Sequence, residues 1–257
     1  MKRAIKICIV ILIGFISMRA TCGKPKPSET NIKAVQVLKI KDFVYYHNMS
    51  ITYNGDHYFT INGGNENYCK LNEYDEKGKA VSSYDVGLDG RAIFYNSDLD
   101  QMYVKVYGQD LYSIGLENND ANIEYSYIFE DDNSSSAMSP DGLYFYEFVR
   151  GKVRVINSED GTIEDSFYLP RYTELEEDGH DVSIAASDNN LFVWGSIDEV
   201  FIYDLSGSYI DKVKLPRIGY GFSLSYCNGL LWIAQDANAR DKGTSGYWFG
   251  YRLDSLE

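Results

Sequence analysis

The sequence has few of the residues from which metal centres and hydrolytic sites are most often built. It contains three histidines in 257 residues, and none lies at a spacing typical of zinc ligands. A Gly-x-Ser-x-Gly motif is absent, and so is the regular acidic spacing of a calcium-binding loop. The sequence therefore indicates no complete catalytic motif, no metal site and no bound cofactor.

Basic residues are also scarce. The chain has 24 Lys and Arg against 38 Asp and Glu, which gives a formal net charge of −14. A surface of this sign repels nucleic acid and anionic lipid. We therefore expect no nucleic-acid partner, and contact with a membrane only through a lipid anchor.

Long apolar runs are limited to the N-terminus. Residues 7–18 are mainly apolar, but the run is too short to span a bilayer comfortably. Lys2, Arg3 and Lys6 precede it and the small-residue stretch 20–23 follows, which is the pattern of a signal peptide. We expect a signal peptide at 1–22, a polar tether at 23–32 and a folded domain at 33–257. The predicted location is the periplasm, the cell surface or the medium.

The four cysteines allow two further hypotheses. The position of Cys22 resembles the acylated cysteine of bacterial lipoproteins, although Arg19 stands where that pattern has an apolar residue; ordinary cleavage after Cys22 is the alternative. Cys69 and Cys227 remain in the folded domain, where an exported protein could join them in a disulfide. Two free thiols are the alternative.

Five similar segments recur along the chain. A turn rich in Asn, Asp, Ser or Gly starts at positions 53, 96, 139, 187 and 226, at intervals of 39 to 48 residues. A strand of small residues precedes each turn, and a strand rich in aromatic and branched residues follows it. Further strands complete units of four, with small side chains suited to an innermost strand near a crowded axis. The sequence predicts an all-β protein.

The two ends of the repeat region complement each other. The fifth unit stops after its third strand, near residues 249–253, and the alternating segment 34–41 has no unit of its own. A strand from the N-terminus that completes the last unit would close a ring and protect its edges. We therefore predict a five-bladed β-propeller of four-stranded blades, closed by the N-terminal strand.

The segment 190–207, with Leu191-Phe192-Val193-Trp194 and Val200-Phe201-Ile202-Tyr203, resembles a blade of the NHL or TolB-like propellers of exported bacterial proteins. Ser139-Pro140-Asp141-Gly142 is similar to a turn of such blades. Those families more often have six or seven blades, so six blades are kept as an alternative to five. The resemblance implies the fold and leaves the function open, because propellers host many activities.

Ligands of propellers usually bind where the connections between blades converge at one mouth of the channel. The connections expected there contain seven candidate ligand-binding residues: His47, Arg91, Arg171, His180, Asp181, Arg217 and Tyr220. Arginine suits carboxylate, sulfate or phosphate. The alternative is that each arginine pairs with a nearby acid, such as Asp89 or Glu174.

The absence of a complete catalytic constellation favours a binding module without catalytic activity, with a protein, peptide or glycan held at the channel mouth. The alternative is a propeller-type lyase or hydrolase that acts on a carbohydrate or a lactone. That alternative requires a cluster such as His47, His180, Asp181 and Arg91 in a pocket.

Overall fold

The computed structural model describes most of the chain as a ring of β-sheets. The described residues are 32–43, 47–64, 66–67, 69–116, 120–175, 179–235, 245–254 and 256. The predicted signal peptide, the predicted tether up to residue 31, and Cys22 lie outside this part of the chain. Within the described ranges, no helix is long and apolar enough to cross a membrane.

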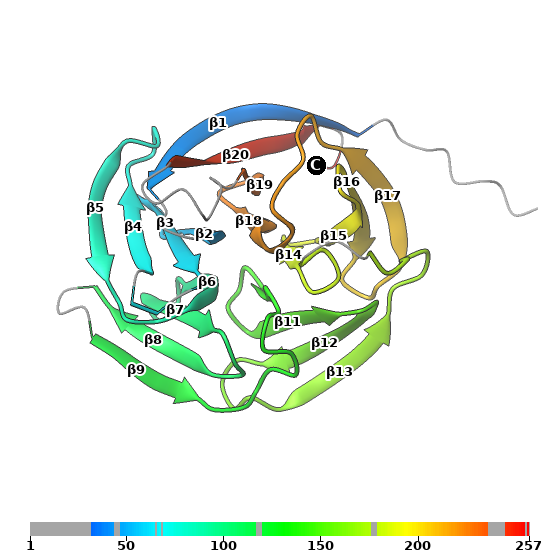
Figure 1. Cartoon of the computed structure of the whole chain (residues 1–257). Helices are drawn as coiled ribbons and strands as arrows, with labels where there is room; N and C mark the ends of the chain where they lie inside the picture. Colours follow the sequence, from blue (N-terminus) through cyan, green and yellow to red (C-terminus); the bar gives the residue numbers. More distant parts are fainter. Residues whose placement is uncertain are drawn as a thin grey trace, which may run out of the picture.

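Five antiparallel sheets of four strands surround a central axis as the blades of a propeller (Figure 1). Blade 1 contains β2 (His47–Tyr53), β3 (Tyr58–Gly63), β4 (Lys70–Tyr74) and β5 (Ala80–Asp85). Blade 2 contains β6 (Gly90–Asn96), β7 (Gln101–Val106), β8 (Leu111–Gly115) and β9 (Asp120–Tyr125). Blade 3 contains β10 (Ala137–Met138), β11 (Tyr144–Val149), β12 (Lys152–Asn157) and β13 (Ile163–Tyr168).

Blade 4 contains β14 (Ile184–Ala186), β15 (Asn190–Ser196), β16 (Glu199–Asp204) and β17 (Tyr209–Lys214). Blade 5 contains β18 (Ser225–Cys227), β19 (Leu230–Gln235), β20 (Ser245–Asp254) and β1 (Lys33–Phe43), and the short 3₁₀ helix η1 (Gly221–Ser223) precedes it. The first strand given for each blade lies nearest the axis (Figure 1). The predicted five-bladed all-β propeller is confirmed, and the described residues form five blades rather than six.

The ring closes through pairing of the two ends of the folded region. β1 lies antiparallel to β20, with a register that runs from Lys33 opposite Asp254 to Phe43 opposite Ser245. β1 is thus the outermost strand of blade 5 (Figure 1). This confirms the prediction that the N-terminal strand completes the last blade. Closure covers the edge that β20 would otherwise expose.

Burial decreases from the second strand of a blade to the fourth. Phe192, Val193 and Trp194 of β15 are fully buried. In blade 3, by contrast, the residues of the outermost strand β13 are mostly exposed. The sequence reflects this gradient in burial, because β15 (NLFVWGS) is mainly apolar, whereas β13 (IEDSFY) contains two acidic residues and a serine.

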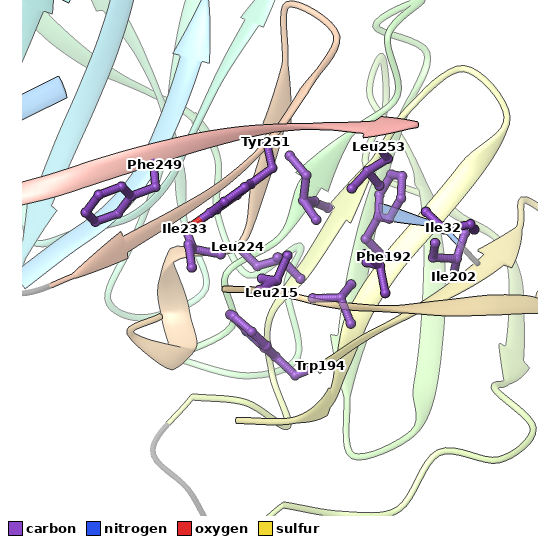
Figure 2. Packing of buried hydrophobic residues seen from close by; sticks show 14 residues of the cluster. Ile32, Phe192, Trp194, Ile202, Leu215, Leu224, Ile233, Phe249, Tyr251 and Leu253 are labelled. Carbon is purple, nitrogen blue, oxygen red and sulfur yellow. The ribbon is translucent and has the colours of Figure 1, made fainter. Parts of the chain in front are cut away.

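The hydrophobic core lies between blades as well as within them. Figure 2 shows Trp194, Phe192 and Ile202 of blade 4 packed with Ile233 and Tyr251 of blade 5. Each sheet therefore buries its faces against its two neighbours, and the ring is needed to complete the core.

Glycines in three hairpins lie against the preceding blade. Gly78, Gly161 and Gly207 follow the third strands of blades 1, 3 and 4 with φ values of +76°, +73° and +84°. An added Cβ would lie 2.5 to 2.9 Å from side-chain atoms of the preceding blade or of the connection that follows it. These positions thus combine a left-handed backbone with close contact between blades, and both conditions favour glycine.

The predicted disulfide between Cys69 and Cys227 is not formed, because the structure has both residues as free cysteines. Cys69 directly precedes the third strand of blade 1, whereas Cys227 ends the innermost strand of blade 5. Consecutive strands run in opposite directions, so these positions lie at opposite ends of neighbouring blades. The two residues belong to adjacent blades, as expected, but face opposite sides of the ring.

A buried carboxylate joins the closing blade to the first one. Asp42 of β1 is fully buried and accepts hydrogen bonds from four side chains. Thr60 Oγ1 (2.8 Å), Asn72 Nδ2 (2.9 Å) and Tyr74 OH (2.5 Å) donate from blade 1, and Trp248 Nε1 (3.0 Å) donates from blade 5. The carboxylate therefore links β1, β3, β4 and β20 at the junction where the ring closes.

We expect Asp42→Ala to lower the free energy of unfolding by at least about 3 kcal/mol, because it leaves several buried donors without an acceptor. Urea unfolding followed by circular dichroism measures this loss. Asp98→Ala, at an exposed hairpin position, is the control and should change the free energy of unfolding by less than about 0.5 kcal/mol. Equal stabilities of the two variants would contradict a role for Asp42 in closure.

Candidate functional site

The two ends of the propeller axis differ in their connections. On one side, here called the loop face, the chain enters each innermost strand after crossing from the previous blade. On the other side, the hairpin face, short turns join each innermost strand to the second strand of its blade. All seven predicted binding residues belong to the loop face by their place in the chain.

A row of three aromatic rings crosses the loop face from blade 5 to blade 1. The rings of His47 and Tyr220 are stacked, with centroids 4.7 Å apart and planes 12° apart. Phe222 lies beside Tyr220 with centroids 5.4 Å apart. Gly179 contacts Phe222 so closely that an added Cβ would lie 2.5 Å from the ring, which brings the connection before β14 against this row.

His180 and Asp181 are adjacent in the chain but have different surroundings. His180 is buried and lies edge-on to Trp194, with ring centroids 5.1 Å apart. The side chain of Asp181 is 24% exposed, and its Oδ2 lies 3.7 Å from Arg150 Nε. Burial raises the pKa of the Asp181 carboxyl, the Arg150 charge partly opposes that shift, and Asp131 and Glu174 add to it. The carboxyl is therefore a stronger base than an ordinary aspartate.

The predicted arginines divide into two groups. Arg91, in the innermost strand β6, is buried and bonded through Nη1 to Asp89 Oδ1 (2.9 Å). Arg171 stacks on Tyr209 of the outermost strand β17, and Arg217 stacks on Phe249 of β20. The pairing with Asp89 agrees with the alternative stated for Arg91. Arg171 thus lies over a ring of the fourth strand of blade 4, and Arg217 lies over a ring of the third strand of blade 5.

A buried lysine and a buried glutamate, which the sequence analysis did not single out, hold the connection between blades 2 and 3. Lys105 Nζ donates to the carbonyl oxygens of Asp131 (2.9 Å) and Asp132 (2.8 Å). The Glu147 carboxylate accepts from the backbone N–H groups of Glu130 (2.9 Å) and Asp131 (3.0 Å). The cation thus binds carbonyl groups of this connection and the anion binds its N–H groups.

Further contacts complete this clamp. Glu147 also accepts from Ser134 Oγ (2.8 Å) and Arg154 Nη1 (2.5 Å). Burial lowers the pKa of Lys105 to about 7, although the nearby Glu147 carboxylate acts in the opposite direction. The sequence did carry a signal for both residues. Each is a single charge in an otherwise apolar or aromatic strand, QMYVKV and YFYEFV.

The hairpin face has a cavity of about 360 Å³ on the axis. It is lined by the ends of all five innermost strands that lie toward the hairpin face and by the turns that follow them. The lining includes Ser50–Tyr53, Ile93–Tyr95, Ser136–Pro140, Ile184–Ala186 and Leu224–Gly229. None of the seven predicted binding residues lines this cavity, because the prediction concerned only the mouth at the connections between blades.

Hydrogen bonds join the innermost strands around the axis, and three of the residues that form them, Ile51, Ile184 and Ser225, also line this cavity. Ser135 N donates to Val182 O (2.9 Å) and Ile184 N donates to Ser135 O (3.0 Å), which joins blades 3 and 4. Ser135 Oγ donates to Arg91 O (3.3 Å) in blade 2, and Ile51 N donates to Ser225 Oγ (3.3 Å) between blades 1 and 5. We call these contacts the serine layer.

No protein-family model matches the sequence, and no curated protein matches it either. Among solved structures, the chain is similar to a glutaminyl cyclase from Myxococcus xanthus, with a TM-score of 0.61 and 9% sequence identity. The match covers 88% of this chain and 98% of the other. At this identity the likeness shows a shared fold.

This comparison corrects the prediction of a binding module without catalytic activity, which is wrong. That prediction relied on likeness to exported propellers and on the absence of a complete catalytic motif. A solved structure of similar fold is an enzyme, so neither argument separates a binding propeller from a catalytic one. The finding agrees better with the alternative of a propeller-type enzyme.

We expect Lys105→Met to lower the free energy of unfolding by about 2 kcal/mol, since the carbonyl groups of Asp131 and Asp132 lose their buried donor. Because the lysine has a pKa of about 7 in the folded chain and an ordinary value of 10.5, the unfolded chain binds more protons between these pH values. The stability of the wild type relative to the variant should therefore rise from about pH 7 to pH 10.5.

Urea unfolding at several pH values tests this expectation, and Lys77→Met in an exposed turn is the matched control. A constant stability difference between wild type and Lys105→Met across this range would show that the buried lysine does not titrate as described.

Proposed function

We propose that this protein is an enzyme, a lyase or hydrolase that acts on a carbohydrate or a lactone, with its catalytic groups on the loop face. The observation that carries the proposal is the Asp181 carboxyl, whose pKa is raised by burial and which lies beside the exposed guanidinium of Arg150. A carboxyl of this kind at the convergence of several blades has the properties of a general base.

The hydrolase and the lyase reactions make the same demand on this pair. In hydrolysis of a lactone, Asp181 takes a proton from water, the water oxygen attacks the carbonyl carbon, the ring C–O bond breaks and the protonated Asp181 returns its proton to the leaving oxygen. Arg150 stabilises the negative oxygen that forms. In elimination, Asp181 takes a proton from the carbon next to a sugar carboxylate and Arg150 stabilises the resulting enolate. The C–O bond at the following carbon then breaks, and the leaving oxygen takes the proton from Asp181.

The aromatic row supports a cyclic substrate. The rings of His47, Tyr220 and Phe222 offer an apolar face to one side of a sugar or lactone ring. The connection that contains Gly179 and Asp181 packs on Phe222, so the proposed base and the proposed platform belong to one packed unit. The Lys105–Glu147 clamp holds the backbone of Asp131, whose charge contributes to the raised pKa of Asp181.

We also propose that the basic and apolar N-terminal segment directs export, that cleavage falls before Cys22, and that Cys22 carries a lipid. The basic start, the short apolar run and the small residues before Cys22 support this proposal. A substrate of the cell envelope or the medium would be consistent with such a location.

We expect Asp181→Asn to lower kcat by about 10²- to 10⁴-fold, because the amide cannot take the proton. The activity of the wild type should rise with pH through the raised pKa of Asp181. Lactone hydrolysis is followed by acid release, and elimination by the ultraviolet absorbance of the unsaturated product. The melting temperature of the variant should equal or exceed that of the wild type at pH 7, since folding raises the pKa of this carboxyl and its ionised form is unfavourable.

Asp165→Asn in the exposed strand β13 is the matched control and should keep the full activity. Full activity of Asp181→Asn on a substrate that the wild type turns over would refute the assignment of the base. A wild type that acts on neither lactones nor uronic-acid polysaccharides would refute the proposed reaction.

Intact-mass spectrometry of the protein from its native host tests export and acylation. We expect a mature chain that begins at Cys22 with the added mass of acyl groups. An unmodified chain that begins beyond residue 22 would refute the lipid and keep export, whereas a chain that retains Met1 would refute both.

A further inference from the structure

The cavity on the hairpin face lies apart from the proposed catalytic groups. The innermost strands run from the loop face to the hairpin face, and the cavity is lined by later residues of these strands and by the turns that follow them, whereas neither Asp181 nor Arg150 is among its lining residues. Its volume of about 360 Å³ falls in the range of small-molecule sites, about 300–1,000 Å³. It is a concave site with its own chemistry.

Hydroxyl groups from three blades lie at its inner end. Ser136 of blade 3 lines the cavity, and its buried Oγ has no hydrogen-bond partner in the structure. Ser50 of blade 1 and Ser225 of blade 5 also line it, with their Oγ atoms 3.3 Å apart. A buried hydroxyl without a partner is unfavourable unless a ligand or water completes its bonding. A ligand with hydroxyl groups would satisfy it.

The lining is otherwise neutral and partly apolar. Neither Lys nor Arg occurs among the described residues that line the cavity, and Asp188 at the exposed rim is its only carboxylate. Burial raises the pKa values of the Cys227 thiol and the Tyr53 hydroxyl, so both stay uncharged at neutral pH. An anion would find no cation here and would meet a protein with a net charge of −14.

Apolar and aromatic surfaces complete the walls. Side chains such as Ile51, Ile93 and Ile184 line the cavity with the tyrosines of three hairpins, Tyr53, Tyr95 and Tyr226. Tyr226 is held by stacking on Phe192, with centroids 5.4 Å apart, and the Tyr53 hydroxyl donates to Gly55 O (2.7 Å). Held rings beside hydroxyl groups suit a molecule that has both an apolar face and hydroxyls.

From these observations we infer that the hairpin-face cavity binds a neutral mono- or disaccharide, with the Ser136 hydroxyl as one of its hydrogen-bond partners. This site is independent of the proposed reaction at the loop face. It could recruit the protein to a glycan or sense a free sugar while the loop face acts on its own substrate.

Isothermal titration calorimetry with the mature chain tests the inference. The probes are glucose, galactose, N-acetylglucosamine and maltose, with glucuronate as the anionic comparison. We expect at least one neutral sugar to bind, and glucuronate to bind at least tenfold more weakly than glucose. Ser136→Ala should weaken binding of the sugar by about three- to tenfold, which corresponds to one hydrogen bond.

Ser183→Ala is the matched control. The Oγ of Ser183 is also buried without a hydrogen-bond partner, but Ser183 does not line the cavity, so its removal should leave the affinity unchanged. Ala186→Leu adds volume inside the cavity and should abolish binding. Thermal unfolding of each variant shows whether it is folded, and the Ser136→Ala result stands if Ala186→Leu does not fold.

Asp181→Asn separates this site from the loop face. Sugar binding that survives Asp181→Asn and weakens in Ser136→Ala supports the inference, whether or not the enzyme proposal holds. Sugar binding that is lost in Asp181→Asn and kept in Ser136→Ala would place the sugar on the loop face and overturn it. Failure of all neutral sugars to bind would overturn it too. A further probe, p-cresol, represents a tyrosine side chain. If p-cresol binds and no sugar does, the cavity would instead suit an aromatic side chain of a partner protein.

Discussion

The structure depends on the pairing of β1 with β20. Without it, blade 5 would keep three strands and expose the edge of β20, and the faces of blades 5 and 1 would not be held together. Asp42 adds a buried polar connection at the same junction, because β1 delivers its carboxylate to donors of two blades. One strand, β1, thus covers the edge of β20 and also supplies the buried carboxylate that links blades 5 and 1.

Small residues near the axis follow from this closure. Five blades leave little room at the centre, and Ser135, Ser183 and Ser225 allow the innermost strands to contact one another. Backbone groups of Ser135 and Ile184 and the hydroxyls of Ser135 and Ser225 thereby form hydrogen bonds with neighbouring blades. The serine layer that results joins innermost strands of neighbouring blades near the axis.

The two faces of the propeller differ in electrostatics. The loop face collects charged groups, among them Asp181 with Arg150 and the connection held by Lys105 and Glu147. Proton transfer needs such groups, and their partial burial shifts the pKa values away from ordinary ones. The hairpin face has hydroxyls, tyrosine rings and aliphatic side chains, which suit recognition of an uncharged molecule. The likeness to a glutaminyl cyclase shows that a propeller of this form can support an enzyme, and the reaction of this chain must be established from its own residues.

The sequence by itself determined the repeats, the strand character of each segment and the closing role of the N-terminal strand. The alternation of apolar and polar residues, the turn residues and the lack of a fourth strand in the fifth unit can all be read from local sequence. The pairing of neighbouring strands follows from these features. Only the tertiary structure decided that Cys69 and Cys227 face opposite sides, that Arg171 and Arg217 stack on outer strands, and that Lys105 and Glu147 meet one connection. It also decided that a cavity lies on the hairpin face. The physical reason is that these encounters depend on the register and packing of segments far apart in the chain, which local patterns do not specify.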